Sequence, residues 1–362
     1  MTTTDPAAQE PSVLERADRL AETVLAPGAA EVDRASLVPP ERLDAVAAAG
    51  FHGLTAPTSV GGIGATPATV DAVVERFAAA CLPTTFVWLQ HLGVAARVAA
   101  CDTPAAEIAP RLADGSRRAG VAIGGVRPGV EPLIASPIGD GWQLDGPIPW
   151  ITGWGSIDVV LVAAMTGEER SRLVWSLVDV GSASASPPAG WTTRRFDLVA
   201  TDAASSVAVR CDAVLVGARS VVAIDDRADW LAADHLGLAM NAALSLGITR
   251  RAVGLLERFD GPAAEFAARL DDTRCRVVAA DPRRTRATDG AATVEGTGLA
   301  DRRAEAALLA WEAAAAVATA QGGAGLAAGS ETERLVREAH FCLVFGTRPE
   351  IRAAQLARLT RR

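Results

Sequence analysis

The spacing of apolar positions divides the chain into three blocks, and the first block is helical. Before residue 120, apolar residues recur three and four positions apart in several segments, which predicts amphipathic helices. Pro39 and Pro40 open one of these helices and Gly50 follows its end, an arrangement that helices favour. The predicted helices cover 13–35, 41–49, 68–100 and a segment that starts at Thr103.

The second block, from Gly120 to about Val222, has short apolar runs typical of strands. Gly, Asp, Pro and Ser turns separate the runs, and no helix-length pattern interrupts them. An all-β antiparallel domain is therefore predicted, in preference to β–α–β units. The runs are VAIGGV, PLIASPI, WQLDGPIPWI, IDVVLVAAM, RLVWSLVDV and SSVAVRCDAVLV.

Helical spacing returns in the third block, which follows Arg227. Its predicted helices cover 228–258, 262–280, 299–328 and a pair across 331–361, with a polar, Arg-rich loop at 281–298. The predicted fold class is α+β, with an N-terminal helical domain, a central antiparallel β domain and a C-terminal helical bundle. The predicted boundaries are a disordered tail at 1–12, then domains at 13–119, 120–222 and 223–362.

Composition narrows the class of protein further. A net charge of -8 argues against a nucleic-acid-binding surface. The N-terminus lacks the basic start and apolar core of a secretory signal, and the longest uncharged stretch is too weakly apolar for a membrane span, so a cytoplasmic protein is expected. The five Cys and four His are dispersed, which predicts reduced thiols and no metal site.

One glycine-rich run bears on the fold class. GGAGLAA at 322–328 contains a G-x-G-x-x-A pattern like that of dinucleotide-binding folds. That motif requires a preceding strand, whereas here an Ala-rich helix precedes it, so a Rossmann-type site is rejected. Two interpretations stay open: a Gly-rich helix end, and a backbone that approaches a phosphate closely.

Five segments, taken in order, resemble the acyl-CoA dehydrogenase family over nearly the whole chain. They are GFHGLTAPTSVGGIG, PRLADGSRRAGVAI, WITGWGSIDVVLVAA, VRCDAVLVGARSVV and QGGAGLAAGSETERLVREAHFCLVFGTRPEIR. They look like the family's first-domain loop, its entry into the β domain, its flavin-contacting strand, its exit from the β domain and its C-terminal signature. The resemblance implies a flavin, FAD with FMN as the alternative, and a homodimer or homotetramer.

The same resemblance implies particular flavin contacts. Trp150 and Thr152 match positions that pack on the isoalloxazine ring and hydrogen-bond near its N5. A second group matches the C-terminal signature, whose first part contacts the adenosine-diphosphate half of the flavin across a dimer interface. This group consists of Gln321, Gly322, Gly323, Gly325, Gly346 and Thr347.

The sequence departs from the family where the family has its charged residues. The family's catalytic base is a Glu that removes the α-proton of an acyl thioester, and its two known locations match Phe345 and Gly237 here. Neither residue accepts a proton. Leu256 stands where the family has an Arg that reaches the flavin pyrophosphate, and about Leu238 replaces an Arg near the CoA-binding face. AIGGVRPGVE replaces the family's T-E-P…G-S-D loop.

Two residues are candidates for acid–base chemistry. His91 lies on the helix that the resemblance places over the substrate pocket, and its apolar neighbours are expected to lower its pKa. The alternative is a buried His that a backbone carbonyl satisfies. Asp234 lies about one turn before the second location of the base, and its alternative is a solvated Asp on a helix face.

Three functions stay open at this point. The first is a flavin-dependent dehydrogenase acting on an acyl thioester or a related small molecule, which passes electrons to a carrier. The second is a flavin-dependent monooxygenase or oxidase of the same fold, which consumes oxygen and needs reduced flavin from a reductase. The third is a non-catalytic subunit that pairs with an active homologue.

Overall fold

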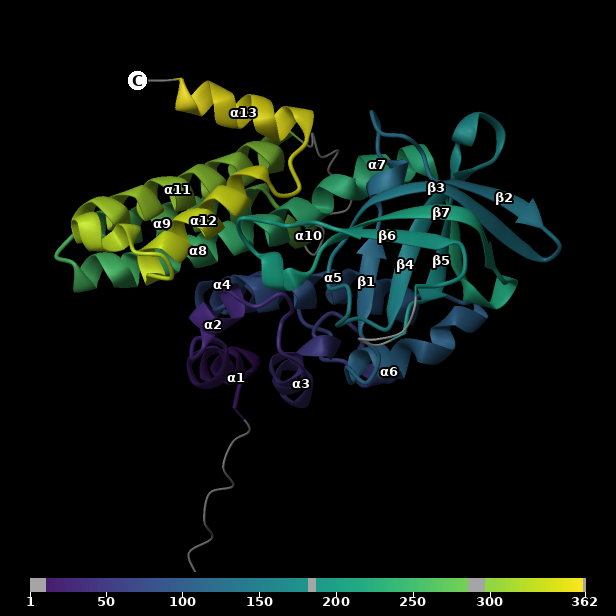
Figure 1. The fold of residues 1–362 in the computed structure, drawn as a ribbon, viewed down its shortest axis with the longest axis horizontal. Coiled ribbons are helices and arrows are strands. Elements are labelled where there is room, and N and C mark those ends of the chain that lie inside the picture. Colours follow the sequence, from purple (N-terminus) through teal and green to yellow (C-terminus); the bar gives the residue numbers. More distant parts are fainter. Residues whose placement is uncertain (1–10, 182–186, 286–296, 361–362) are drawn as a thin grey trace, which may run out of the picture.

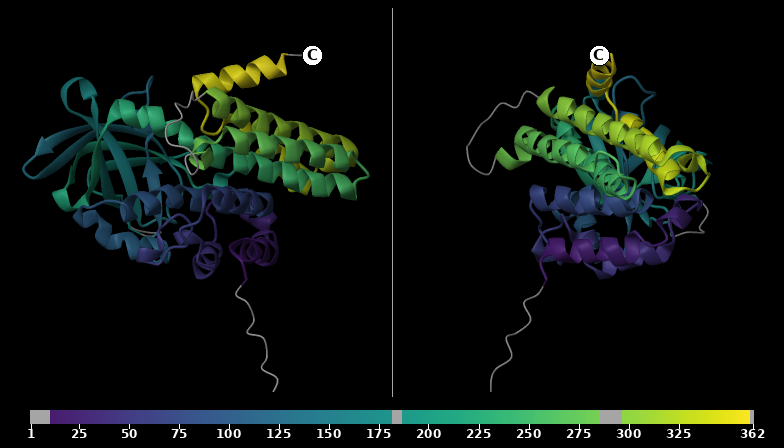
Figure 2. Two further views of the ribbon diagram at one scale, coloured as in Figure 1. Left: turned by 180° about the vertical axis from the view of Figure 1, so that it is seen from behind. Right: turned by 90° about the vertical axis from the view of Figure 1, so that its left-hand side faces the viewer.

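The computed structural model describes residues 11–181, 187–285 and 297–360, in which a helical block precedes the sheet along the chain and another follows it (Figures 1 and 2). The N-terminal helices lie beneath the C-terminal bundle, and the sheet stands beside both. This is the predicted order of helices, sheet and helices. Most of the predicted tail at 1–12 lies outside the described residues.

The N-terminal block contains more helix breaks than the apolar pattern predicts. The segment 13–35 is interrupted at Gly28, whose φ of 69° is left-handed. The segment 68–100 breaks at Cys81, which is extended, because Pro83 then falls in the first turn of a new helix. The helices are α1 (Val13–Leu20), α2 (Ala29–Asp33), α3 (Pro40–Ala48), α4 (Pro67–Ala80), α5 (Leu82–Ala99) and α6 (Ala109–Ala113).

The central sheet is mixed and mostly antiparallel. Its order is β6-β7-β3-β2-β4-β5-β8, with β1 paired to β4 off this path. The prediction of a purely antiparallel sheet is corrected at two pairings, since β1 and β2 each run parallel to β4. The strands are β1 (Ala119–Ala122), β2 (Ile134–Ile138), β3 (Gly141–Ile151), β4 (Val159–Thr166), β5 (Arg172–Asp179), β6 (Trp191–Arg195), β7 (Val207–Val216) and β8 (Val221–Asp226).

The C-terminal block is a bundle built around α8. The long predicted helix at 299–328 ends earlier, because α11 stops at Gln321 and Gly322 turns with a φ of 68°. Within the predicted loop at 281–298, α10 forms a short helix, and most of the rest lies outside the described residues. The helices are α7 (Arg227–Ala233), α8 (Leu238–Arg258), α9 (Ala263–Ala280), α10 (Pro282–Thr285), α11 (Thr297–Gln321), α12 (Glu331–Val344) and α13 (Pro349–Leu359).

A shared apolar core joins the bundle to the N-terminal helices. It contains buried residues from α4 and α5 together with residues from α8, α11 and α12. At Gly247 of α8, a side chain would lie 2.5 Å from the carbonyl oxygen of Glu75, so the two helices pack at backbone distance. The run 227–258 is long and apolar enough to cross a membrane by composition, but half of its apolar window is buried inside the protein.

Candidate functional site

Trp150 lies near the end of β3, and half of its surface is exposed. Its ring stacks on Phe196, with centroids 3.9 Å apart and planes inclined by 25°. The Arg194 guanidinium lies 4.8 Å from the Phe196 centroid, which is within cation–π distance. These three side chains form the surface stack. A Trp that is 50% exposed offers a flat apolar surface to a ligand.

Thr152 lies two residues after Trp150, directly after the end of β3, and is buried. Its Oγ1 is 3.0 Å from the Ser206 Oγ, and either hydroxyl can donate. The adjoining loop is strained, because Thr201 and Ser205 adopt left-handed φ values of 57° and 46°. Backbone hydrogen bonds hold this loop in place: Gly153 donates to the Ala204 carbonyl at 2.8 Å. The segment therefore fixes a hydroxyl pair beside Trp150.

Gln321 and the glycines that follow it form a second group. A side chain on Gly325 would lie 3.0 Å from the Gln321 Oε1 and 3.1 Å from the Thr332 Cγ2, so bare backbone is needed there. The Gln321 Oε1 and the Thr332 Oγ1 are buried and have no partner among the described residues. Gly322 and Gly323 are exposed. Bare backbone beside unpaired polar atoms fits a nucleotide-like ligand.

The Gln321 group and the residues Gly346 and Thr347 lie at opposite ends of α12. The 3₁₀ turn Gly322–Leu326 packs against α11 and α12 at the end of the bundle remote from the sheet (Figure 1). Gly346 and Thr347 follow the other end of α12, a helix of 14 residues and about 21 Å. The Thr347 hydroxyl donates to the Val344 carbonyl at 3.1 Å, and Gly346 has a φ of 58°. Gly346 and Thr347 therefore cap the C-terminus of α12.

Phe345, which the sequence resemblance aligns with the family's base, packs within an aromatic cluster. Its ring centroid lies 4.7 Å from that of Phe86 and 5.1 Å from that of Phe341. The Phe86 and Phe341 centroids are 4.9 Å apart. These three side chains form the core triad, which joins α5 to α12. A triad of hydrocarbon rings supplies no proton acceptor.

His91 is buried on α5, and both of its ring nitrogens have backbone partners. Its Nε2 lies 2.9 Å from the Leu112 carbonyl, and its Nδ1 accepts from the Ala119 N–H at 3.0 Å. Its ring meets His52 edge-on at 4.8 Å. Burial lowers the pKa of His91 to about 4, so the ring is neutral at pH 7. These contacts favour the packing interpretation, and the acid–base role stays a prediction.

Asp234 is held between two arginines instead of facing solvent. Its carboxylate lies 2.7 Å from a guanidinium nitrogen of Arg127 and 2.7 Å from one of Arg348. Arg348 also donates to the Asp234 carbonyl at 2.7 Å. Arg127 comes from the turn after β1, so this cluster connects the sheet to the residues that follow α12. Gly237 lies one turn further on in the same segment.

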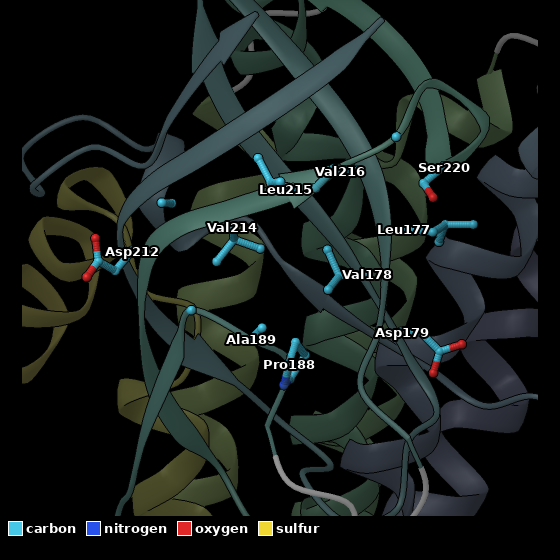
Figure 3. Close-up of a pocket in the computed structure, with 13 residues that line it drawn as sticks. Leu177, Val178, Asp179, Pro188, Ala189, Asp212, Val214, Leu215, Val216 and Ser220 are labelled. Atoms are coloured by element: carbon cyan, nitrogen blue, oxygen red, sulfur yellow. The ribbon is translucent and has the colours of Figure 1, made fainter. Parts of the chain in front are cut away.

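The structure adds contacts that the sequence pattern did not signal. Ser206 and Phe196 come from the β6–β7 region, and no spacing relates them to Trp150. A cavity of about 420 Å³ lies between β5 and β7, with Val178, Val214 and Asp212 among its lining residues (Figure 3). None of the residues predicted to bind flavin lines it. Among the described residues, no group of three metal-ligating side chains occurs.

Three kinds of comparison relate the chain to known proteins. The model of the acyl-CoA dehydrogenase N-terminal domain matches residues 8–116. A 3-sulfinopropanoyl-CoA desulfinase of Variovorax paradoxus is 31% identical over 160 residues, which are 42% of this chain and 40% of that protein. The chain therefore aligns with well under half of this relative's length.

Solved structures match over almost the full chain. Butyryl-CoA dehydrogenase from Megasphaera elsdenii has a TM-score of 0.81 at 18% identity, covering 99% of this chain and 100% of that one. Dibenzothiophene monooxygenase from Paenibacillus sp. A11-2 has a TM-score of 0.78 at 20% identity, covering 97% of both chains. The same monooxygenase in an FMN-bound structure gives 0.79 at 20% identity, covering 97% of this chain and 98% of that one.

The order of helices, sheet and helices identifies the fold class of the chain. This chain has the acyl-CoA dehydrogenase superfamily fold, and its N-terminal part matches that family's N-terminal domain. At 18–20% identity the structural matches establish the fold and leave the reaction of this chain undetermined.

Proposed function

We propose that the chain is a flavin-dependent oxidoreductase in which the flavin ring lies against Trp150 at the edge of the sheet. The half-exposed Trp150 carries this proposal, because a flat apolar side chain at that exposure suits a flat ring. Thr152 and Ser206 place a hydroxyl group beside Trp150, and this group can donate a hydrogen bond to a nitrogen of the flavin ring. A bound flavin would supply two-electron transfer, and the chain supplies its position.

The nucleotide half of the cofactor is proposed to meet Gln321, Gly325 and Thr332. Their unpaired oxygen atoms and bare backbone support this placement. The resemblance to the acyl-CoA dehydrogenase family places this contact across a dimer interface, so one flavin would meet Trp150 of one subunit and this group of another. A homodimer or homotetramer is therefore part of the proposal, in a cytoplasmic protein. FAD is favoured, and FMN is the alternative because Leu256 replaces the pyrophosphate-binding Arg.

The core triad argues against α-proton removal at the usual position. A general base must lie within about 3 Å of the proton that it removes, and Phe345 has no acceptor atom. The substrate is proposed to be an acyl thioester or a related small molecule, with an electron carrier as partner. The Asp234 carboxylate is already paired with two cations, Arg127 and Arg348.

A flavin-dependent monooxygenase is the second candidate. The absence of an acceptor at Phe345 favours it, because oxygen transfer does not require an α-proton to be removed there. The likeness to dibenzothiophene monooxygenase adds support for the fold only. Such an enzyme needs reduced flavin from a separate reductase, whereas a dehydrogenase passes electrons to a carrier protein.

The test begins with the visible spectrum of the purified chain and identification of any released flavin. We expect absorbance near ~450 nm, the general flavin band, as purified or after reconstitution with FAD or FMN. Failure with both flavins overturns the proposal. Anaerobic mixing with saturated acyl-CoAs should leave the flavin oxidised, and rapid bleaching would locate a base elsewhere, with Asp234 the first suspect.

Oxygen then separates the two candidates. Oxygen-dependent formation of a hydroxylated product from a small aromatic or thioester substrate, with reduced flavin supplied and in excess of a control without the chain, identifies the monooxygenase. Electron transfer to an artificial acceptor without oxygen identifies the dehydrogenase. Flavin binding with neither reaction, until a homologous chain is added, identifies the third alternative, a non-catalytic subunit.

A further inference from the structure

The segment between β6 and β7 carries Phe196 of the surface stack and also contacts the C-terminal bundle. Phe196 directly follows β6, and its N–H donates to the carbonyl of Ser206 at the other end of the segment, at 3.0 Å. Between these ends, the Val199 carbonyl accepts a hydrogen bond from Arg337 of α12 at 3.0 Å. The Val199 side chain is 70% exposed, so it does not anchor the segment. The bundle therefore holds the segment near Val199 through a backbone carbonyl.

All of the guanidinium nitrogens of Arg337 have acceptors. The Nη1 donates to the Asp33 Oδ1 at 3.1 Å and to the Val199 carbonyl at 3.0 Å. The Nη2 donates to the Asp33 Oδ2 at 2.5 Å and to the Glu333 Oε2 at 2.9 Å, and the Nε donates to the Glu333 Oε1. A guanidinium has five N–H groups in a fixed planar fork, and these contacts use every one of them. We call Arg337, Asp33, Glu333 and the Val199 carbonyl the arginine clasp.

Two carboxylates fix the orientation of the Arg337 guanidinium. Asp33, at the end of α2, has a side chain that is 3% exposed, and the Arg337 side chain is 26% exposed. Hydrogen bonds to Glu333 and Asp33 raise the pKa of Arg337, and the hydrogen bond from Arg337 lowers the pKa of Glu333. Charge-assisted hydrogen bonds of this kind are stronger than neutral ones. The fork is therefore set by α2 and α12, and its one remaining N–H meets the Val199 carbonyl.

The arginine clasp also connects to the turn that contains Gly325, a member of the Gln321 group. The Glu333 N–H donates to the Ser330 Oγ at 3.1 Å, and the Ser330 hydroxyl donates to the Gly325 carbonyl at 3.1 Å. Because Glu333 also accepts from the clasp arginine, a continuous set of hydrogen bonds joins Gly325 to Val199. This network links the two groups of residues to which the proposed function assigns flavin contacts.

We propose that Arg337 is a positioning residue of the flavin site, which holds the segment after β6 so that Phe196 stacks on Trp150. This inference rests on the proposed function, in which the surface stack contacts the flavin. Arg337 acts through the Val199 carbonyl, three residues after Phe196, and not by contact with the flavin. A lysine cannot replace it, because an ammonium has three N–H groups and no planar fork. The two carboxylates attract those three donors most strongly, so the Val199 carbonyl is released.

The first experiment compares amide hydrogen exchange in the wild-type chain and in Arg337→Lys, both without flavin. The lysine keeps the charge beside the two carboxylates, so we expect the variant to fold. The Leu198 N–H donates to the Asp202 Oδ1 at 3.0 Å, and it should exchange roughly tenfold faster in the variant, as expected for the loss of one hydrogen bond. Exchange should stay the same after Ala203, whose carbonyl accepts separately from the Val38 N–H at 2.8 Å. Unchanged exchange at Leu198 overturns the proposal.

Hydroxyl-radical footprinting of the flavin-free chain then measures the surface stack itself. If the segment after β6 moves in Arg337→Lys, Phe196 uncovers one face of Trp150, and the oxidation rate of Trp150 should rise. Faster exchange near Leu198 with an unchanged oxidation rate of Trp150 overturns the positioning role, because the segment then moves without the stack. Neither measurement uses flavin. A wild-type chain that binds no flavin therefore contradicts the proposed function, while the footprint still decides whether Arg337 positions the stack.

Flavin titration measures the consequence for binding. Arg337→Lys should weaken flavin binding by about two- to fivefold, as expected when one aromatic pair loses its geometry. Arg269→Lys is the matched control, because Arg269 pairs only with Glu312 at an exposed position, and it should leave the affinity unchanged. Val74→Ala, at a fully buried position of α4, controls for a general loss of stability. Wild-type affinity in Arg337→Lys, or an equal loss of affinity in Val74→Ala, overturns the proposal.

Discussion

The surface stack and the core triad each combine three side chains, but they differ in exposure: Phe86 is buried and Phe341 and Phe345 are half-buried, whereas Trp150 is 50% exposed. In the core triad, rings from α5 and α12 meet edge-on and face-on, so each ring is covered by another. In the surface stack, Phe196 covers one side of Trp150, and half of the Trp150 surface stays exposed. The rings of the core triad contact one another, whereas the exposed surface of Trp150 is available for contact with a ligand.

This contrast bears on the chemistry of the fold. The sequence resemblance aligns Phe345 of the core triad with the family's proton acceptor and Trp150 of the surface stack with its flavin contact, and the proposed function rests on that alignment. A chain that fills the first and leaves the second open is suited to hold a flavin without removing a proton at Phe345. The contrast between the core triad and the surface stack therefore favours a redox or oxygen reaction in which no proton is transferred at Phe345.

The largest expected effect comes from breaking the core triad. Phe86→Ala should lower the free energy of unfolding by about 3–5 kcal/mol, because Phe86 is 5% exposed and its loss leaves a cavity beneath two other rings. Denaturant unfolding followed by circular dichroism measures this. Phe86→Leu, which keeps most of the volume, should cost markedly less and serves if the alanine variant does not fold. A loss below about 1 kcal/mol for the alanine variant would show that the triad is not closed.

The next effect concerns His91, five residues after Phe86 on α5. Its pKa falls from 6.5 in the unfolded chain to about 4 in the fold, so the unfolded chain binds the proton first as pH drops. Stability is therefore complete above pH 6.5 and is lost progressively down to about pH 4. For His91 alone the loss is roughly 3 kcal/mol, at about 1.4 kcal/mol per pKa unit.

Urea unfolding at several pH values between 7 and 4 tests this. His91→Gln should flatten the dependence, although His52, whose pKa burial also lowers, will keep part of it. His340→Gln, at an exposed position, is the matched control and should leave the curve unchanged. An unchanged curve in His91→Gln would mean that His91 is not buried as a neutral ring. Full turnover in the same variant, once a substrate is known, would end the acid–base prediction.

Periodicity predicted the order of the three blocks, because helical and strand spacing differ over long segments. It missed the breaks at Gly28 and Cys81. A one-residue interruption such as Cys81 barely changes the phase of the apolar positions on either side. It also missed the parallel pairing of β1 and β2 with β4, since strand direction depends on long-range connections that local spacing does not encode.

The sequence predicts individual residues of the candidate site but not their contacts, because those contacts join segments that are distant in the sequence. The neighbours of Trp150 in the sequence match a family segment, which predicts a flavin contact but carries no information on the stacking partner of Trp150. The partners of His91 are backbone atoms 21 and 28 residues away, which no side-chain pattern signals. The arginines around Asp234 lie 107 and 114 residues from it. Such contacts depend on the complete fold.

Trp150→Ala tests the role of the surface stack in flavin binding. Because Trp150 is half exposed, its removal should change the free energy of unfolding by about 1 kcal/mol or less. It should weaken flavin binding by roughly tenfold, which is about 1.4 kcal/mol, through loss of ring stacking. Flavin fluorescence titration measures the affinity. Unchanged affinity in a folded variant would remove Trp150 from the proposed site.

The smallest expected effect concerns Phe196, and it decides which side of Trp150 faces a ligand. Phe196 stacks on one face of the Trp150 ring at 3.9 Å, and its backbone N–H donates to the Ser206 carbonyl at 3.0 Å. Ser206 in turn pairs with Thr152, so Phe196 and Thr152 are fixed by the same segment. We therefore expect Phe196 to support Trp150 from behind, leaving the opposite face for the flavin. Phe196→Ala should then weaken flavin binding by about two- to fivefold, within the 0.5–1.5 kcal/mol of one aromatic pair, whereas Phe196→Leu should weaken it less. Tighter binding in Phe196→Ala would show instead that Phe196 occupies the flavin's own position and must move aside before the ring can bind.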